Sequence, residues 1–240
     1  MRRPALVLAF AILLAGCEVP SLGMPSPVSK EGNDIYSLWR GFIVASFVVG
    51  GIVVGLILYA AIRYRRRDDE VPSQNAYNIP IEIFYTVMPI VIVAGLFGFT
   101  VATQMKVTNP ASSGQPALVV NVTGFQWGWR FELPEQHVTV EGAGEVTTPA
   151  IDVPVDRTVH FVLRTEDVNH AFWVPQFLEK RDLIQGIDNS IDITPTQVGE
   201  YGGKCAEFCG LDHWRMQFTI RVVTQGDFDA WVRSQPQSGR

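Results

Sequence analysis

Charged residues are scarce in this sequence. Asp, Glu, Lys and Arg make up 18% of the 240 residues, whereas apolar residues make up 47%; soluble domains typically carry about 25% charged residues. This balance excludes a disordered chain and a chain that coats nucleic acid. A mass of 26.6 kDa is enough for one or two domains with a sizeable core.

Several chemical signatures are also missing. The three cysteines form no Cys-x-x-Cys-His run, so no c-type haem is attached to this chain. The sequence offers no nucleophile paired with a base, no phosphate-binding loop and no open metal position. It therefore gives no bond-making catalytic site of its own.

Negative charge is concentrated in the second half of the chain. Residues 107–240 carry 10 Lys/Arg and 17 Asp/Glu, whereas residues 1–106 carry 9 and 7. An acidic surface repels the phosphates of nucleic acids and attracts basic proteins through long-range steering. We therefore expect a basic protein partner and no nucleic acid.

The N-terminus has the layout of a secretory signal peptide over residues 1–16. Two arginines precede an apolar run from Ala5 to Leu14, which is too short to cross a bilayer. The run Leu14-Ala15-Gly16-Cys17 resembles a bacterial lipoprotein signal, in which Cys17 would become the acylated N-terminus; the alternative is an incidental cysteine. Residues 17–35 would then be an extracytoplasmic segment.

Two long apolar runs predict a transmembrane hairpin over residues 36–106. Gly41–Ile62 contains 22 uncharged residues and Ile83–Met105 contains 23, and each run is long enough for one crossing. The basic cluster Arg63–Arg67 between them lies in the cytoplasm by the positive-inside rule. Both ends of the mature chain then face outward from a bacterial inner membrane.

Beyond a Gly/Pro/Ser-rich linker at residues 107–117, the pattern predicts an all-β sandwich or barrel over residues 118–224. Short β-rich runs recur between turn residues. Residues 125–131 alternate strictly, so we expect one core strand there, with Phe125, Trp127 and Trp129 on the same face. A helix is expected near 226–232, within a C-terminal segment of residues 225–240. The expected strands are Leu118–Thr123, Gln126–Leu133, Thr158–Arg164, Ser190–Ile193, Gly199–Lys204 and Gln217–Val223.

The strongest chemical signal combines thiols, imidazoles and a thioether: Cys205, Cys209, His213, Met216 and, upstream, His170. Soft sulfur ligands with imidazole select copper, and two Cys with one Met exceed the needs of a mononuclear site, so two bridging thiolates would hold two coppers. The alternatives are a Cys205–Cys209 disulfide and a Cys₂His₂ zinc site. Neither explains Met216. His137 and His160 receive no role.

These residues resemble the copper A site of cytochrome c oxidase subunit II, and the resemblance covers about Tyr36 to Val223. It includes the two helices, the aromatic run Gly124–Trp129 and the segment Glu166–His170. The resemblance implies a cupredoxin-like Greek-key sandwich that accepts electrons from cytochrome c at binuclear copper A. It passes them to haem–copper subunit I, which lies beside subunit III and reduces oxygen to water with proton translocation.

The resemblance also assigns the ligands. His170 and His213 would be terminal copper ligands, Cys205 and Cys209 would bridge, and Met216 would bind weakly. Glu207 would bind copper through its backbone carbonyl, while its side chain would face a magnesium ion shared with subunit I. The chain would thus be the electron-transfer subunit of an enzyme, embedded in membrane lipid.

Further residues match family positions for electron transfer from cytochrome c. Trp127 matches the tryptophan through which the electron passes to copper, although a bulge is needed to expose it. The docking acids would be Glu132, Glu135 and Asp167; the alternative is a merely solvated charged face. Two departures stand out: Gly128 replaces a common aromatic, and Lys180–Asn189 lacks the usual Pro and Arg around its glycine.

Glu82 lies at the cytoplasmic start of the second apolar run. The resemblance implies that it gates a proton path into subunit I, as a matching Glu does in the family. The alternative role is stabilisation of the helix N-terminus next to Pro80. Two other functions remain open: a copper A subunit of a nitric oxide reductase, and a membrane-anchored copper carrier or assembly protein. A quinol oxidase subunit lacks the ligand set, and nitrous oxide reductase is much longer.

Overall fold

The computed structural model describes residues 22–67, 69, 71, 74–108, 118–143 and 147–236. The expected signal peptide, Cys17 and most of the linker lie outside these residues. The described chain divides into two compact units. One unit is Ser37–Val107, and the other joins the N-terminal residues up to Tyr36 to everything from Thr108 onward.

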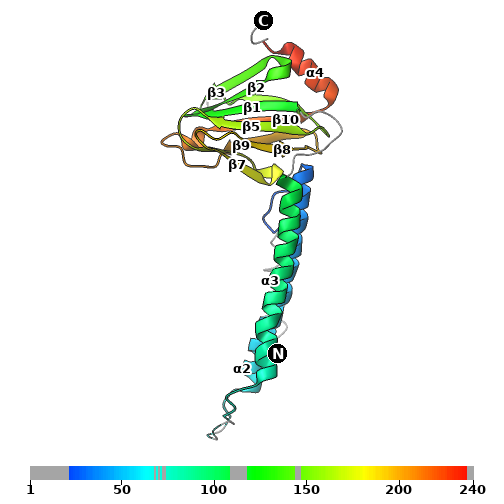
Figure 1. The fold of residues 1–240 in the computed structure, drawn as a ribbon, viewed down its shortest axis with the longest axis vertical. Coiled ribbons are helices and arrows are strands. Elements are labelled where there is room, and N and C mark those ends of the chain that lie inside the picture. The colour runs from blue at the N-terminus through cyan, green and yellow to red at the C-terminus, as the bar shows by residue number, and fades with distance from the viewer. Residues whose placement is uncertain are drawn as a thin grey trace, which may run out of the picture. The chain divides into compact units, whose positions relative to one another are not determined.

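Two long helices account for the apolar runs: α2 (Lys30–Arg63) and α3 (Ile79–Thr108). Their apolar windows have mean hydropathies of 2.6 and 2.0, so both are long and apolar enough to cross a membrane. α3 contains Pro89 in its interior. The expected pair of apolar helices is therefore confirmed (Figure 1).

The remaining chain forms a β-sandwich of two five-stranded sheets, with α4 (Gln225–Ser234) near its C-terminus (Figure 1). The strand orders are β3-β2-β1-β5-β8 and β4-β10-β9-β6-β7. Strand β5 runs parallel to β1, and β4 runs parallel to β10. The expected architecture, two apolar N-terminal helices followed by an all-β sandwich, is thus confirmed. The strands are β1 (Leu118–Phe125), β2 (Gly128–Leu133), β3 (Val138–Ala143), β4 (Ala150–Pro154), β5 (Val159–Thr165), β6 (His170–Val174), β7 (Glu179–Leu183), β8 (Asn189–Ile193), β9 (Gly199–Cys205) and β10 (Gln217–Val223).

An aromatic cluster fills the core between the sheets. Phe218 of β10 stacks on Phe172 of β6 with ring centroids 4.9 Å apart, and Trp129 of β2 meets Phe218 edge-on at 5.1 Å. All three side chains are buried. Gly203 of β9 lies against Phe218, whose ring leaves no room for a larger residue there. This packing gives the strand ends next to the core a rigid base.

The prediction of one strand through residues 125–131 is wrong. β1 ends at Phe125 and β2 begins at Gly128, and these two residues pair across a two-residue turn of Gln126 and Trp127. The Gln126–Trp127 peptide bond is cis. Trp129 is buried as expected, whereas Trp127 lies in the turn, where it is half-buried and packs against the core. A hairpin turn, not a bulge, therefore places Trp127.

Residues Val28–Gly32, close to the start of the described chain, pack on the sandwich. We call this segment the N-terminal strap. The Val28 N–H donates to the Gln176 carbonyl at 3.1 Å, and the Lys30 N–H donates to the Thr194 carbonyl at 3.0 Å. Val28 and Ser29 are buried. The Ser29 hydroxyl accepts the Gly32 N–H at 3.0 Å and so caps α2. We expected this segment to end before a helix at residue 36, but it belongs to the sandwich and already contains the helix start.

Candidate metal centre

The sulfur and imidazole groups of the sequence meet where three strands end. His170 begins β6, Cys205 ends β9, and Met216 immediately precedes β10. The Cys205 N–H donates to the Met216 carbonyl at 2.9 Å. The loop between β9 and β10 carries Cys209 and the short helix η3 (His213–Arg215), so backbone pairing at its base fixes both ends of this loop.

The sulfur and nitrogen atoms of these side chains lie close enough together to bind a metal ion. Cys205 Sγ lies 3.8 Å from His170 Nδ1 and 3.9 Å from Cys209 Sγ. Cys209 Sγ lies 3.4 Å from both His213 Nδ1 and Met216 Sδ. Both cysteines are free thiols, so this structure contains no Cys205–Cys209 disulfide. The ligand atoms of His170, Cys205 and Cys209 all lie within 4.8 Å of one another.

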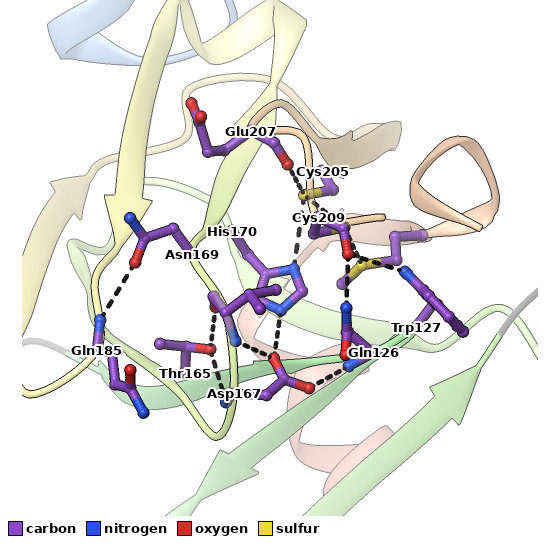
Figure 2. A network of polar contacts seen from close by, with 12 residues as sticks. Gln126, Trp127, Thr165, Asp167, Asn169, His170, Gln185, Cys205, Glu207 and Cys209 are labelled. Atoms are coloured by element: carbon purple, nitrogen blue, oxygen red, sulfur yellow. Dashed lines mark hydrogen bonds and ion pairs between the residues drawn. The ribbon is translucent and has the colours of Figure 1, made fainter. Parts of the chain in front are cut away.

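Glu207 contributes its backbone rather than its side chain to this cluster. Its carbonyl oxygen lies 3.2 Å from Cys205 Sγ. The carboxylate is exposed and points away from the two cysteines (Figure 2). The residue can therefore offer a carbonyl ligand inward and a carboxylate outward.

Asp167 holds the outer side of His170 (Figure 2). Its Oδ1 lies 2.9 Å from His170 Nε2, which leaves Nδ1 facing Cys205. The same carboxylate accepts the N–H of Gln126 at 2.7 Å and of Val168 at 2.6 Å. Burial raises the pKa of Asp167, but the bonds from His170 and the two N–H groups outweigh it, so its pKa is lowered overall. Asp167 is thus an ionised, engaged carboxylate.

Trp127 touches the cysteine loop through its indole. Its Nε1–H donates to the Cys209 carbonyl at 3.1 Å, and the Gln126 side-chain amide donates to the same oxygen at 2.8 Å (Figure 2). Gly210, at φ +117°, leaves space for this approach, because a Cβ there would lie 3.2 Å from the indole. Trp127 is therefore half-buried and in direct contact with the loop.

The two thiols differ in acidity. Burial raises the pKa of Cys205, but its contact with His170 outweighs burial, so the net pKa is lowered. Burial and the neighbouring Cys205 charge raise the pKa of Cys209 to about 12. Without a cation, ionisation of one thiol therefore opposes ionisation of the other, because two thiolates at this separation repel each other. A bound cation removes that restriction.

The other proposed docking acids lie outside this network. Glu132 is half-buried in β2, and Glu135 is exposed in the short helix η1 (Pro134–Gln136). Sequence reasoning also missed two features: the amide of Gln126 on the cysteine loop, and an exposed apolar rim on that loop. The rim consists of Phe208, Leu211 and Trp214, which are 77%, 83% and 57% exposed. In the sequence, these large apolar residues lie between the proposed metal ligands, and this pattern could have indicated the rim.

Glu82 takes part in the N-terminal cap of α3. Its Oε1 accepts the N–H of Asn78 at 2.9 Å, while the Asn78 side-chain oxygen accepts the N–H of Ile81 at 3.4 Å. This reciprocal pattern satisfies helix donors that otherwise lack partners. The geometry supports the capping role that the sequence left open, and it leaves the proton role as a proposal.

Comparison with known proteins covers both units of the chain. The family of the cytochrome c oxidase subunit II periplasmic domain matches residues 118–223, and the family of its transmembrane domain matches residues 19–101. The probable cytochrome c oxidase subunit 2 of Streptomyces avermitilis is 38% identical, covering 98% of this chain and 85% of that protein. The Mycobacterium tuberculosis subunit 2 is 32% identical, covering 95% and 80%.

Among solved structures, the periplasmic domain of subunit II of cytochrome oxidase from Bradyrhizobium japonicum is similar, with 30% identity and a TM-score of 0.48. It covers 50% of this chain and 95% of that one. The family matches span most of the described chain, and the curated relatives align along nearly all of it. The chain therefore belongs to the family of cytochrome c oxidase subunit II, with a membrane-anchoring pair of helices, and its buried His170, Cys205 and Cys209 cluster is a copper A-type site.

Proposed function

We propose that this subunit accepts electrons from cytochrome c at a binuclear copper A centre and passes them to the haem–copper subunit I. The observation that carries the proposal is the convergence of two thiols, a thioether and imidazoles around Cys205 and Cys209. Reduction of oxygen to water and proton translocation would then take place in the partner subunits. Subunit III is a further expected partner in the same membrane.

The donor set fits copper. Thiolate, thioether and imidazole are the ligands that soft copper ions prefer, whereas zinc sites rarely include methionine. His170 and His213 would be terminal ligands, Cys205 and Cys209 would bridge, Met216 would bind weakly, and the Glu207 carbonyl would complete the set. When bound, the copper pair supplies reversible one-electron transfer.

The role of the chain is to hold these donors still. His170 is fixed between Cys205 and Asp167, and the strand ends on either side are tied by backbone hydrogen bonds. A site whose ligands are already in place changes little between oxidation states, which favours fast electron transfer. The two cysteines are buried, which limits their contact with water.

Trp127 offers the path from the surface to this site. Its Nε1–H contacts the Cys209 carbonyl directly, so an electron that reaches the indole lies one hydrogen bond from a bridging cysteine. Acidic residues of this domain, namely Asp167, Glu132 of β2 and Glu135 of η1, would steer a basic cytochrome c toward it. The electron donor is thereby brought close to Trp127.

The remaining assignments rest on the family. The outward Glu207 carboxylate would bind magnesium shared with subunit I, and Glu82 would gate a proton path at the cytoplasmic end of α3. The chain would lie in the inner membrane of a bacterial cell with the copper domain outside, and an acylated Cys17 would add a lipid anchor.

The test uses the full chain in lipid nanodiscs, because the strap is part of the sandwich. We expect two coppers per chain that share one unpaired electron in the paramagnetic resonance spectrum, and loss of that signal in Cys205→Ser. The matched control His137→Gln changes an exposed histidine of η1's C-cap and should keep the signal. One copper, zinc, or copper released readily to a chelator would instead favour a metal carrier.

A further inference from the structure

Glu179 is a buried carboxylate outside the copper site. It begins β7, and its side chain is only 8% exposed. One oxygen, Oε2, lies 3.5 Å from Arg181, while Oε1 has no hydrogen-bond partner within the described part of the chain. The side-chain oxygen of Gln176, just upstream, is a second buried acceptor without a partner there. Both oxygens are hydrogen-bond acceptors without a donor, and protonation of Glu179 would create an O–H donor at this place.

The N-terminal strap packs directly on this part of the sandwich. It connects the short helix η2 (Pro175–Phe177), which precedes Glu179, to the segment after β8. The Thr196 N–H donates to the Val28 carbonyl at 2.8 Å, and the Ser29 hydroxyl donates to the Phe177 carbonyl at 3.4 Å. The contact is close, since a Cβ on Gly32 would lie 2.8 Å from the Phe177 carbonyl oxygen.

Three charged groups face Glu179 from three elements: Arg181 on its own strand, Glu31 on the strap and Asp192 on β8. Glu31 accepts the Thr194 N–H at 2.8 Å, and Asp192 is bound to His160 Nδ1 of β5 at 2.5 Å. Burial raises the pKa of Glu179 to about 7; Arg181 opposes the rise, while Glu31 and Asp192 add to it.

A metal cation does not account for this cluster. Among the described residues, the one group of His, Cys, Asp and Glu whose ligand atoms gather within 4.8 Å is the copper candidate. The oxygens of Glu31, Glu179 and Asp192 are therefore not arranged around a common point. A proton, unlike a metal ion, needs only one carboxylate oxygen. It is therefore the cation that carboxylates arranged in this way can bind.

We propose that Glu179 is a proton-binding group that controls closure of the strap: the neutral acid favours the closed strap, and the ionised carboxylate favours an open strap that admits water. The inference does not depend on copper. In the open state the carboxyl returns to its ordinary pKa of 4.5, so the closed state binds more protons. Closure is therefore fully favoured below pH 4.5 and is progressively lost as the pH rises to about 7.

Hydrogen exchange on the full chain in lipid nanodiscs tests the proposal. The measured quantity is the protection factor of the amides of Val28, Lys30, Thr194 and Thr196, which removes the intrinsic pH dependence of exchange. Between pH 5 and 8 we expect protection to fall by up to about 70-fold in the wild type. In Glu179→Gln the four amides should stay protected at pH 5 and at pH 8. The control Glu200→Gln changes an exposed carboxylate of β9 and keeps the wild-type fall.

Constant wild-type protection, or an unchanged fall in Glu179→Gln, would overturn the proposal. Glu31→Gln covers the case in which Glu179→Gln does not fold, because its amide oxygen still accepts the Thr194 N–H. Loss of the Glu31 charge lowers the pKa of Glu179, so the midpoint of strap opening moves to lower pH. The pH at which the infrared band of protonated, ¹³C-labelled glutamate disappears should shift in the same direction. A midpoint that does not move, or the absence of that band at pH 6, would refute proton control.

Discussion

The carboxylate of Asp167 lies 2.9 Å from Nε2 of His170 and 2.7 Å from the backbone nitrogen of Gln126. One side chain therefore fixes a proposed copper ligand and the hairpin turn that carries Trp127. We expected Asp167 to be a docking acid, whose charge would be offered to a partner. In this structure the carboxylate is already engaged on three sides, so its main effect is on the geometry of the site.

The substitution Asp167→Asn tests this relationship. An amide can still contact His170 but cannot accept from both the imidazole and the Gln126 N–H in the same way, so we expect copper affinity to fall about 10- to 100-fold. Competition with a copper chelator measures the loss. Glu135→Gln, which neutralises an exposed acid in η1, serves as the control. Wild-type affinity in Asp167→Asn would leave only the docking role.

Trp127→Phe should slow electron transfer without disturbing the metal. The substitution keeps an aromatic ring but removes the Nε1–H bond to the Cys209 carbonyl. We expect reduction of copper by cytochrome c to slow at least tenfold, which corresponds to about 1.4 kcal/mol of activation free energy. Stopped-flow spectroscopy gives the rate, and an unchanged copper spectrum shows that the site is intact. An unaltered rate would remove Trp127 from the path.

Two adjacent glycines of β9 should respond differently to alanine. A Cβ on Gly203 would lie 2.1 Å from the Phe218 ring, whereas a Cβ on Gly202 would meet nothing within 4 Å. Because the ring is held in the core cluster, Gly203→Ala should lower the free energy of unfolding by about 1–3 kcal/mol. Gly202→Ala should be neutral or slightly stabilising. Chemical denaturation of both variants measures the difference, and equal effects would contradict the packing described.

Glu82→Gln separates the two roles of this residue. The glutamine oxygen can still accept the Asn78 N–H, so the helix cap should survive and the assembled oxidase should have normal stability. If Glu82 gates a proton path, turnover should fall at least about tenfold. Oxygen consumption by the assembled enzyme provides the measurement. Wild-type turnover would show that capping is the whole function of Glu82.

Much of the fold could be predicted because its signals are local. The apolar runs of α2 and α3 and the alternating pattern of β1 each lie within one short window of sequence. Strands β3, β4, β6 and β7 were missed. Three of them, β3, β4 and β7, lie at the edges of their sheets, where charge and proline are tolerated, whereas β6 lies inside its sheet. Four of the five residues of β7 are charged, so its pattern does not indicate a strand.

The hairpin at Gln126 and Trp127 was missed for a different reason. A turn of two residues does not interrupt an alternating pattern of apolar and polar residues. The pair Gln126-Trp127 is also not the Asn-Gly or Asp-Gly pair that marks such turns. The copper ligands of the β9–β10 loop could be found because they cluster within one segment. The hydrogen bond from the Gln126 N–H to Asp167 could not be found, since these residues lie 41 positions apart in the sequence.

The backbone and side chains around Gly128 leave no room for a Cβ at this position. A Cβ at Gly128 would lie 2.5 Å from the Gly142 carbonyl oxygen and 2.6 Å from the Phe125 ring. The ring of Phe125 thus occupies the space that a side chain at position 128 requires. An aromatic cannot be introduced there by a single mutation. Because the Gly142 oxygen belongs to the backbone, replacing Phe125 alone does not make room, and any side chain at position 128 requires the two paired strands to move apart.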